Sequence, residues 1–182
     1  MSLNIINPFK FTAPEETYCQ APSECTAESA IRYLAGQDPD YTRLGIKVTA
    51  SDSNFIQDDV TKVSIFARRY GTPSGNIYCK VYAANGTTVI ATSDAVLIQN
   101  VSTSAAYVDF NFSSSFDIAQ NYYIVCDVID ATMSYGNWWT TCIGASSEYS
   151  DTSTVKFNND PNGGWETMAS SWDVKLCITY SG

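Results

Sequence analysis

Three tryptophans and one tyrosine in the C-terminal part of the chain are the residues best suited by type to recognise a ligand. Trp138 and Trp139 are adjacent, Tyr149 follows them, and Trp165 comes directly after the polar segment 158–164, NNDPNGG. An aromatic ring stacks on the face of a pyranose, and neighbouring amides and carboxylates hydrogen-bond the sugar hydroxyls. These four residues therefore form a candidate carbohydrate-binding site. The alternative is that they fill the core or a subunit interface, since large aromatic side chains are mostly buried.

The positions of these aromatic residues lead to two structural expectations. If 138 and 139 lie on a strand, one tryptophan must face the core and the other must face outward, because side chains alternate along a strand. The segment 158–165, NNDPNGGW, is expected to be a loop that contains Trp165. It offers one carboxylate, Asp160, whereas calcium takes about six to eight oxygen ligands. A turn is therefore expected there, with no metal site.

The chain contains no histidine. This excludes Ser-His-Asp and Cys-His triads, histidine-ligated metals, and histidine as a general base near neutral pH. Carboxylate chemistry of the glycosidase type remains open, with Asp109, Asp127, Glu148 and Asp173 as candidates, but the sequence does not pair them. Asp109 and Asp173 are expected on the solvated side of half-exposed strands. The prediction is a protein without catalytic residues, without a cofactor and without enzymatic activity.

The charge balance is acidic, with 19 Asp and Glu against 10 Lys and Arg, a formal net charge of -9. An acidic surface repels nucleic-acid phosphates and anionic lipids, so neither nucleic acid nor membrane is an expected partner. No apolar run approaches the roughly 20 residues that span a bilayer. The first residues lack the basic and apolar regions of a signal peptide. We expect synthesis in a cytoplasm, with an extracellular location as the alternative if a signal has been removed.

Six cysteines are spread through the chain without any CxxC pair, which argues against structural zinc and thioredoxin-like chemistry. Cys79 and Cys126 lie in apolar strand patterns, where a free thiol behaves as a small hydrophobic group. Cys19 and Cys25 are the only pair close in sequence. A short-loop disulfide between them is one option, and free thiols are the other.

The N-terminal part differs in pattern from the rest of the chain. Residues 1–26 contain three prolines, which break regular structure, together with isoleucines and phenylalanines that would need a surface to cover them. We expect an extended arm there. Residues 26–35, TAESAIRYLA, have helical spacing and a possible Thr26 cap, which predicts one short helix.

From residue 44 onward the apolar residues recur with period two, as expected for half-buried strands. Turn signals separate the strands, among them GTPSG at 71–75 and ANG at 84–86, where Asn-Gly tolerates positive φ at both positions. Many short strands with such turns predict an all-β fold. We expect a jelly-roll-like antiparallel β-sandwich over residues 27–182, preceded by the arm at 1–26.

The order of signals between residues 44 and 129 is LGIKVTA, VTKVSIFARRYGTPSGNIYCKVY, NGTTVIATSDAV, AAYVDFNF and NYYIVCDV. It resembles the jelly-roll β-sandwich modules of phage virion structural proteins and of carbohydrate-binding and surface proteins. The segment INPFKF at 6–11 is similar to the start of many phage virion proteins. The resemblance covers about half of the chain, and it is weakly specific for function because this fold hosts many roles.

Together these observations predict a non-enzymatic virion structural protein: a head-decoration, fibre or tail-accessory subunit. It would assemble through its arm with other virion proteins and with copies of itself, and would be located in the virion. The alternative is a lectin-like module that binds glycans through exposed tryptophans. A carboxylate glycosidase is a third hypothesis.

Overall fold

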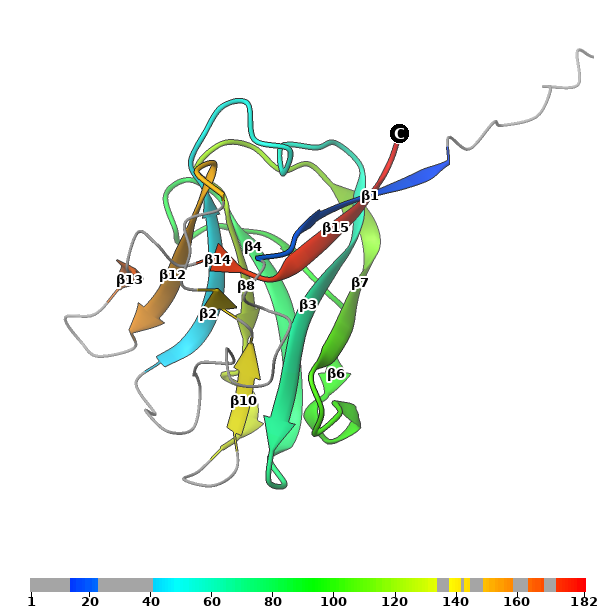
Figure 1. Ribbon diagram of the computed structural model, residues 1–182, viewed down its shortest axis with the longest axis vertical. Helices are drawn as coiled ribbons and strands as arrows, with labels where there is room; N and C mark the ends of the chain where they lie inside the picture. Colours follow the sequence, from blue (N-terminus) through cyan, green and yellow to red (C-terminus); the bar gives the residue numbers. More distant parts are fainter. Residues whose placement is uncertain are drawn as a thin grey trace, which may run out of the picture.

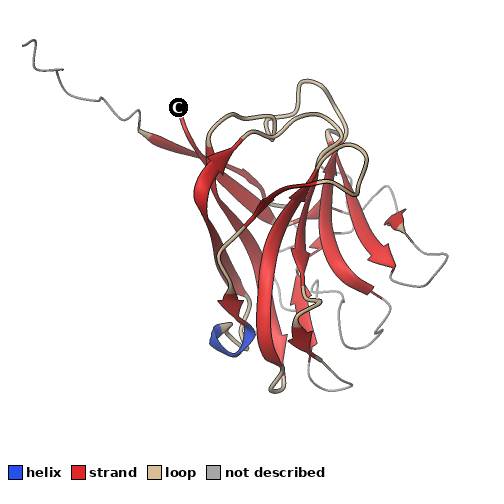
Figure 2. Ribbon diagram, turned by 180° about the vertical axis from the view of Figure 1, so that it is seen from behind, coloured by secondary structure: helices blue, strands red, loops and turns tan. Residues whose placement is uncertain are grey.

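The computed structural model is an all-β sandwich (Figures 1 and 2). It describes residues 14–22, 41–133, 138–141, 143–144, 149–158, 164–168 and 173–182. Two antiparallel sheets pack face to face, as the strand pattern predicted. Within the described ranges the helical structure is a 3-10 turn, η2 (Ile98–Asn100). No described helix is long and apolar enough to cross a membrane.

The five-stranded sheet contains the first and the last strand of the described chain. Its order is β1-β15-β3-β10, and β7 pairs with β3 as well. The bounds are β1 (Glu15–Gln20), β15 (Leu176–Ser181), β3 (Val60–Tyr70), β10 (Trp138–Thr141) and β7 (Ala106–Phe116). In Figure 1 the blue β1 runs beside the red β15, so both described ends lie at one corner.

The eight-stranded sheet has the order β13-β12-β2-β8-β4-β5, with the short strands β6 and β9 beside β4. Its bounds are β13 (Trp165–Thr167), β12 (Thr152–Asn158), β2 (Tyr41–Val48), β8 (Tyr123–Asp127), β4 (Ser74–Tyr82), β5 (Val89–Thr92), β6 (Val96–Leu97) and β9 (Ala131–Thr132). A separate pair joins β11 (Ile143–Gly144) to β14 (Asp173–Val174). The main strands alternate between the two sheets along the chain, so each connection between successive main strands crosses the sandwich. These strands are β2, β3, β4, β7, β8, β10, β12 and β15.

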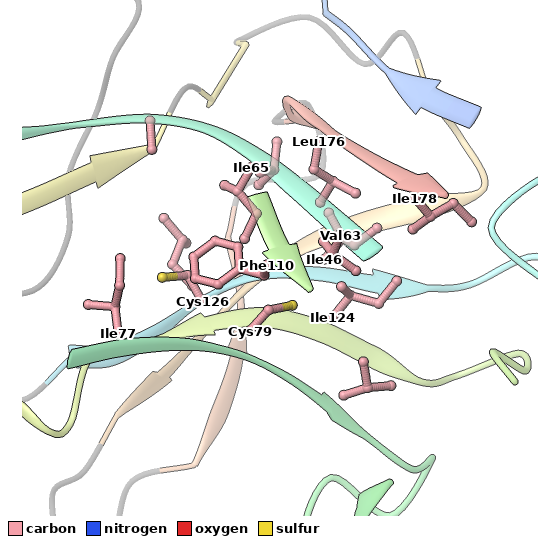
Figure 3. Packing of buried hydrophobic residues seen from close by; sticks show 14 of the residues in the cluster. Ile46, Val63, Ile65, Ile77, Cys79, Phe110, Ile124, Cys126, Leu176 and Ile178 are labelled. Atoms are coloured by element: carbon pink, nitrogen blue, oxygen red, sulfur yellow. The ribbon is translucent and has the colours of Figure 1, made fainter. Parts of the chain in front are cut away.

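The core lies between the sheets and is built from alternate residues of each strand (Figure 3). Because successive side chains point to opposite faces, one apolar set per strand meets the opposing sheet. The largest fully buried members include Trp139, Phe55, Phe110, Ile46, Ile65, Ile77, Ile124 and Ile178. Cys79 and Cys126 are opposite each other on β4 and β8, buried and free, as expected. Burial raises the pKa of both thiols, so both stay protonated.

The β4–β5 hairpin forms at the Asn-Gly signal, but with a different turn from the expected one. Gly86 has a φ of 70°, whereas Asn85 is not among the described residues with positive φ. Instead the Asn85 side chain accepts hydrogen bonds from the backbone N–H groups of Thr87 and Thr88. A Cβ at Gly86 would lie 2.7 Å from the Trp165 ring, so this position needs glycine for space as well as for φ.

The disulfide of the described chain joins Cys19 to Cys177, not Cys19 to Cys25. The two cysteines face each other across β1 and β15, with their Cα atoms 4.0 Å apart. Sequence proximity pointed to the wrong partner, because antiparallel pairing brings together residues 158 positions apart. Cys25 lies outside the described residues.

The predicted arm is regular where it is described. Residues 15–20 form β1. Tyr18 and Gln20 point inward, whereas Glu15 and Thr17 stay exposed. Pro14 and Pro22 bound this strand rather than disrupt it. Residues 1–13 and the helix predicted at 26–35 lie outside the described residues.

Candidate functional site

The adjacent tryptophans lie on β10, as the strand argument required. Trp139 is the inward member: it is 1% exposed and meets Phe110 edge-to-face. No face of its ring is available to a ligand, so Trp139 is a core residue and leaves the candidate set. The side chain of Trp138 lies outside the described part of the chain, although its backbone pairs with Tyr70.

Trp165 is the first residue of β13 rather than part of a loop. Its ring stacks on Tyr123, with the centroids 4.6 Å apart, and meets Tyr82 and Phe157 edge-to-face. Its indole N–H donates to the Gly86 carbonyl, 2.7 Å away. Trp165 thereby covers a second small hydrophobic cluster on the outer face of the eight-stranded sheet. The packing of the Trp165 ring therefore agrees with the alternative interpretation, in which these tryptophans fill hydrophobic clusters.

Tyr149 is half-buried and precedes β12. Its hydroxyl accepts a hydrogen bond from the Ala21 N–H, and its own N–H donates to Asp173. Of the four predicted residues, the three described side chains therefore occupy three separate environments. They do not form one carbohydrate-binding platform.

The candidate acids also separate. Asp109 is exposed as predicted, but Asp173 is only 2% exposed, which contradicts its expected solvated position. The alternation itself holds, because Val174, Leu176 and Ile178 all enter the core. The opposite face is covered at Asp173, where the Tyr149 N–H donates to the carboxylate. Glu148 lies outside the described residues.

Asp127 is fully buried in an ion cluster on the outer face of the eight-stranded sheet. Arg43 Nε and Lys80 Nζ each lie 2.9 Å from its Oδ2, and the Ile129 N–H donates to its Oδ1. Burial alone would raise the pKa of Asp127, but the Ile129 N–H and the two cations together outweigh it and hold the pKa below its ordinary value. The carboxylate is thus locked as an anion that ties β2, β4 and β8 together.

A pocket of about 240 Å³ opens on the outer face of the five-stranded sheet, where sequence reasoning named no residue. Its lining comes from four strands: Glu15 of β1, Thr61 and Lys62 of β3, Asn111 and Phe112 of β7, and Thr179 of β15. The lining combines a carboxylate, an ammonium, an amide and hydroxyls with one ring. Phe112 is nearly buried and packs on Phe116, so it anchors the pocket to the core.

A β-bulge creates this hollow. Lys62 pairs with Thr179 on one side and Asn111 on the other, whereas Val60 pairs with Tyr180 and Phe116. Thr61 is therefore skipped in both ladders, and residues 112–115 of β7 are left out of the ladder with β3. The bulge lets Val60 face the core although Lys62 faces solvent. Bulges of this kind redirect side chains and are common beside binding sites.

The sequence contained weak evidence for this site. Lys62 and Ser64 on β3, and Asp109 and Asn111 on β7, alternate with core residues and therefore share the outer face. Nothing in the sequence indicated that β7 would pair with β3, or that β1 would supply Glu15. No protein-family model, no curated protein and no solved structure matches this chain.

Proposed function

We propose that this protein is a non-enzymatic carbohydrate-binding module whose ligand occupies the pocket at the β3 bulge. The observation that carries the proposal is the convergence of Glu15, Lys62, Asn111 and Thr179 on one hollow. A sugar hydroxyl both donates and accepts hydrogen bonds. A carboxylate accepts from it, an ammonium donates to it, and amides and threonine hydroxyls do both.

Charge favours a neutral sugar over an acidic one. The pocket contains Glu15, and Asp109 lies beside it with its Oδ2 4.0 Å from Lys62 Nζ. The positive charge of Lys62 is therefore balanced by nearby carboxylates. The chain as a whole carries a net charge of -9. A uronic or sialic acid would meet repulsion here, whereas a neutral hexose would not.

The test is a glycan array that displays neutral and acidic oligosaccharides, probed with the wild type and with Asn111→Ala. We expect binding to neutral glycans and a loss of about tenfold in affinity in the variant, since a few hydrogen bonds to the ligand disappear. Asn100→Ala is the matched control, because this exposed amide belongs to η2, at the opposite end of the sandwich from the C-terminus (Figure 2). Its affinity should be unchanged.

Two results would contradict the proposal. One is the absence of binding to every glycan on the array. The other is binding that survives Asn111→Ala but disappears in Trp165→Ala, which would return the site to the tryptophan on β13.

A second candidate function, a virion structural subunit, is favoured by the position of β1. This strand lies at the edge of the five-stranded sheet and is bonded covalently to β15. The residues before Pro14 include Ile5, Ile6, Phe9 and Phe11. We propose that this apolar segment attaches the subunit to neighbouring virion proteins or copies of itself. The two functions are compatible in a subunit that binds a host glycan.

Light scattering of the full chain at micromolar concentration tests this attachment. We expect a homo-oligomer for the wild type and a monomer for Phe9→Asp/Phe11→Asp, because charged residues cannot be buried in an apolar interface. Ser2→Asp/Thr12→Asp adds the same charge to the same segment without removing apolar surface, and should remain oligomeric. A wild type that is strictly monomeric would rule out assembly through this segment.

A further inference from the structure

The pocket lies at one end of a longer row of outward side chains. Two residues further along the strands from the Lys62–Asn111 pair, Ser64 of β3 lies opposite Asp109 of β7. The Ser64 hydroxyl donates to the Asp109 carboxylate over 2.6 Å. Two residues further, Phe66 faces Tyr107. All of these positions share the outer face of the five-stranded sheet, since each pair is directly opposite and the spacing is even.

Phe66 and Tyr107 form an aromatic platform. Their rings meet edge-to-face with centroids 5.2 Å apart, and the Lys175 ammonium lies 4.1 Å from the Phe66 centroid. Tyr107 is 42% exposed, and Tyr70, at 51%, is the other exposed large aromatic side chain among the described residues. Partial burial raises the pKa of Tyr107, and the electrostatic effect of Tyr149, a ligand residue predicted from the sequence, adds to it.

The distance along the row exceeds the size of one sugar. Asn111 in the pocket and Tyr107 on the platform are four residues apart on β7, which corresponds to roughly 13 Å along an antiparallel strand. Between them, Asp109 offers a carboxylate that is half exposed to solvent. A ligand that fills the pocket and also reaches the platform must therefore be a chain of sugars.

We propose that Phe66 and Tyr107 form a second subsite, so that the ligand is a linear neutral oligosaccharide rather than a monosaccharide. This inference rests on the proposed function and deepens it. One sugar is held by hydrogen bonds in the pocket, the next units pass Asp109, and a distal ring stacks on Tyr107. Aromatic stacking adds affinity without requiring a particular hydroxyl pattern.

The experiment measures calorimetric affinities for two homologous series, glucose to cellotetraose and glucose to maltotetraose. With the wild type we expect one series to gain about tenfold in affinity between the monosaccharide and the tetrasaccharide. Tyr107→Ala should abolish this gain and leave monosaccharide affinity unchanged. Tyr107→Phe retains the ring and should retain the gain. Since Tyr107 is exposed, neither variant is expected to unfold the protein.

The outcomes separate this inference from the proposed function. If the sugars bind with the same affinity at every length, or if Tyr107→Ala keeps the gain, the second subsite is wrong while the pocket stands. If no member of either series binds and the array shows no other neutral glycan bound, the neutral-glycan pocket fails, and the second subsite fails with it.

Discussion

Removal of the Cys19–Cys177 disulfide by Cys19→Ser/Cys177→Ser will lower the free energy of unfolding by about 5 kcal/mol. The disulfide links residues separated by 158 positions. In the chain-entropy account, closing so long a loop removes much of the conformational freedom of the unfolded chain, which gives a value at the upper end of the usual range. Chemical denaturation of both proteins without reductant measures the difference as a shift of the urea midpoint.

The matched control is Thr17→Ala/Thr179→Ala. These threonines face each other on the same two strands, two residues along from the cysteines, and share one hydroxyl hydrogen bond of 3.1 Å. Their loss should cost about 1 kcal/mol. Equal effects of the two double substitutions would show that the disulfide adds nothing beyond strand pairing.

Asp127→Asn is expected to destabilise the protein by about 3–5 kcal/mol at neutral pH. The substitution leaves Arg43 and Lys80 without the anion that both contact at 2.9 Å, and removing one partner from a buried ion cluster leaves uncompensated charge. Thermal or urea unfolding measures the loss. Asp109→Asn is the control, since this half-exposed carboxylate lies 4.0 Å from Lys62 and should contribute less than about 1 kcal/mol.

The pH dependence has a definite sign. The pKa of Asp127 is lower in the folded protein than its ordinary value. Its contribution to stability is therefore fully present above about pH 4, the ordinary value for an aspartate, and is lost as the pH falls through the folded pKa. The difference in stability between wild type and Asp127→Asn should shrink in that acidic range. A difference that stays constant down to pH 2 or so would contradict this assignment.

The strands were predictable because alternation is a local property. Val63 and Ile65 face inward and Lys62 and Ser64 outward on β3, as period two requires. β1 was missed because Pro14 and Pro22 suggested an irregular segment, although the strand fits between them. The partner of Cys19 was missed for another reason: strand order is set by contacts remote in sequence, and no local pattern encodes it.

The site was harder to predict than the fold. Tryptophan content drew attention to Trp139 and Trp165, whose type suits sugar binding, but type does not determine burial. The pocket depends on a bulge at Thr61 and on the neighbours that pairing brings to it. Exposed polar residues such as Asn111 are common on any strand, so their convergence becomes visible only in three dimensions.

The adjacency of β1 and β15 has a mechanical consequence. The Gly182 N–H donates to the Pro14 carbonyl, so both described ends leave the sandwich at one corner. A pulling force applied to the N-terminal segment enters through β1, which carries Glu15 of the pocket, and the Cys19–Cys177 bond passes it to β15. If the subunit is tethered by this segment while it holds a glycan, the covalent path from the tether reaches Glu15 directly and Thr179 through the disulfide. Force reaches Lys62 and Asn111 through the pairing of β15 with β3 and of β3 with β7.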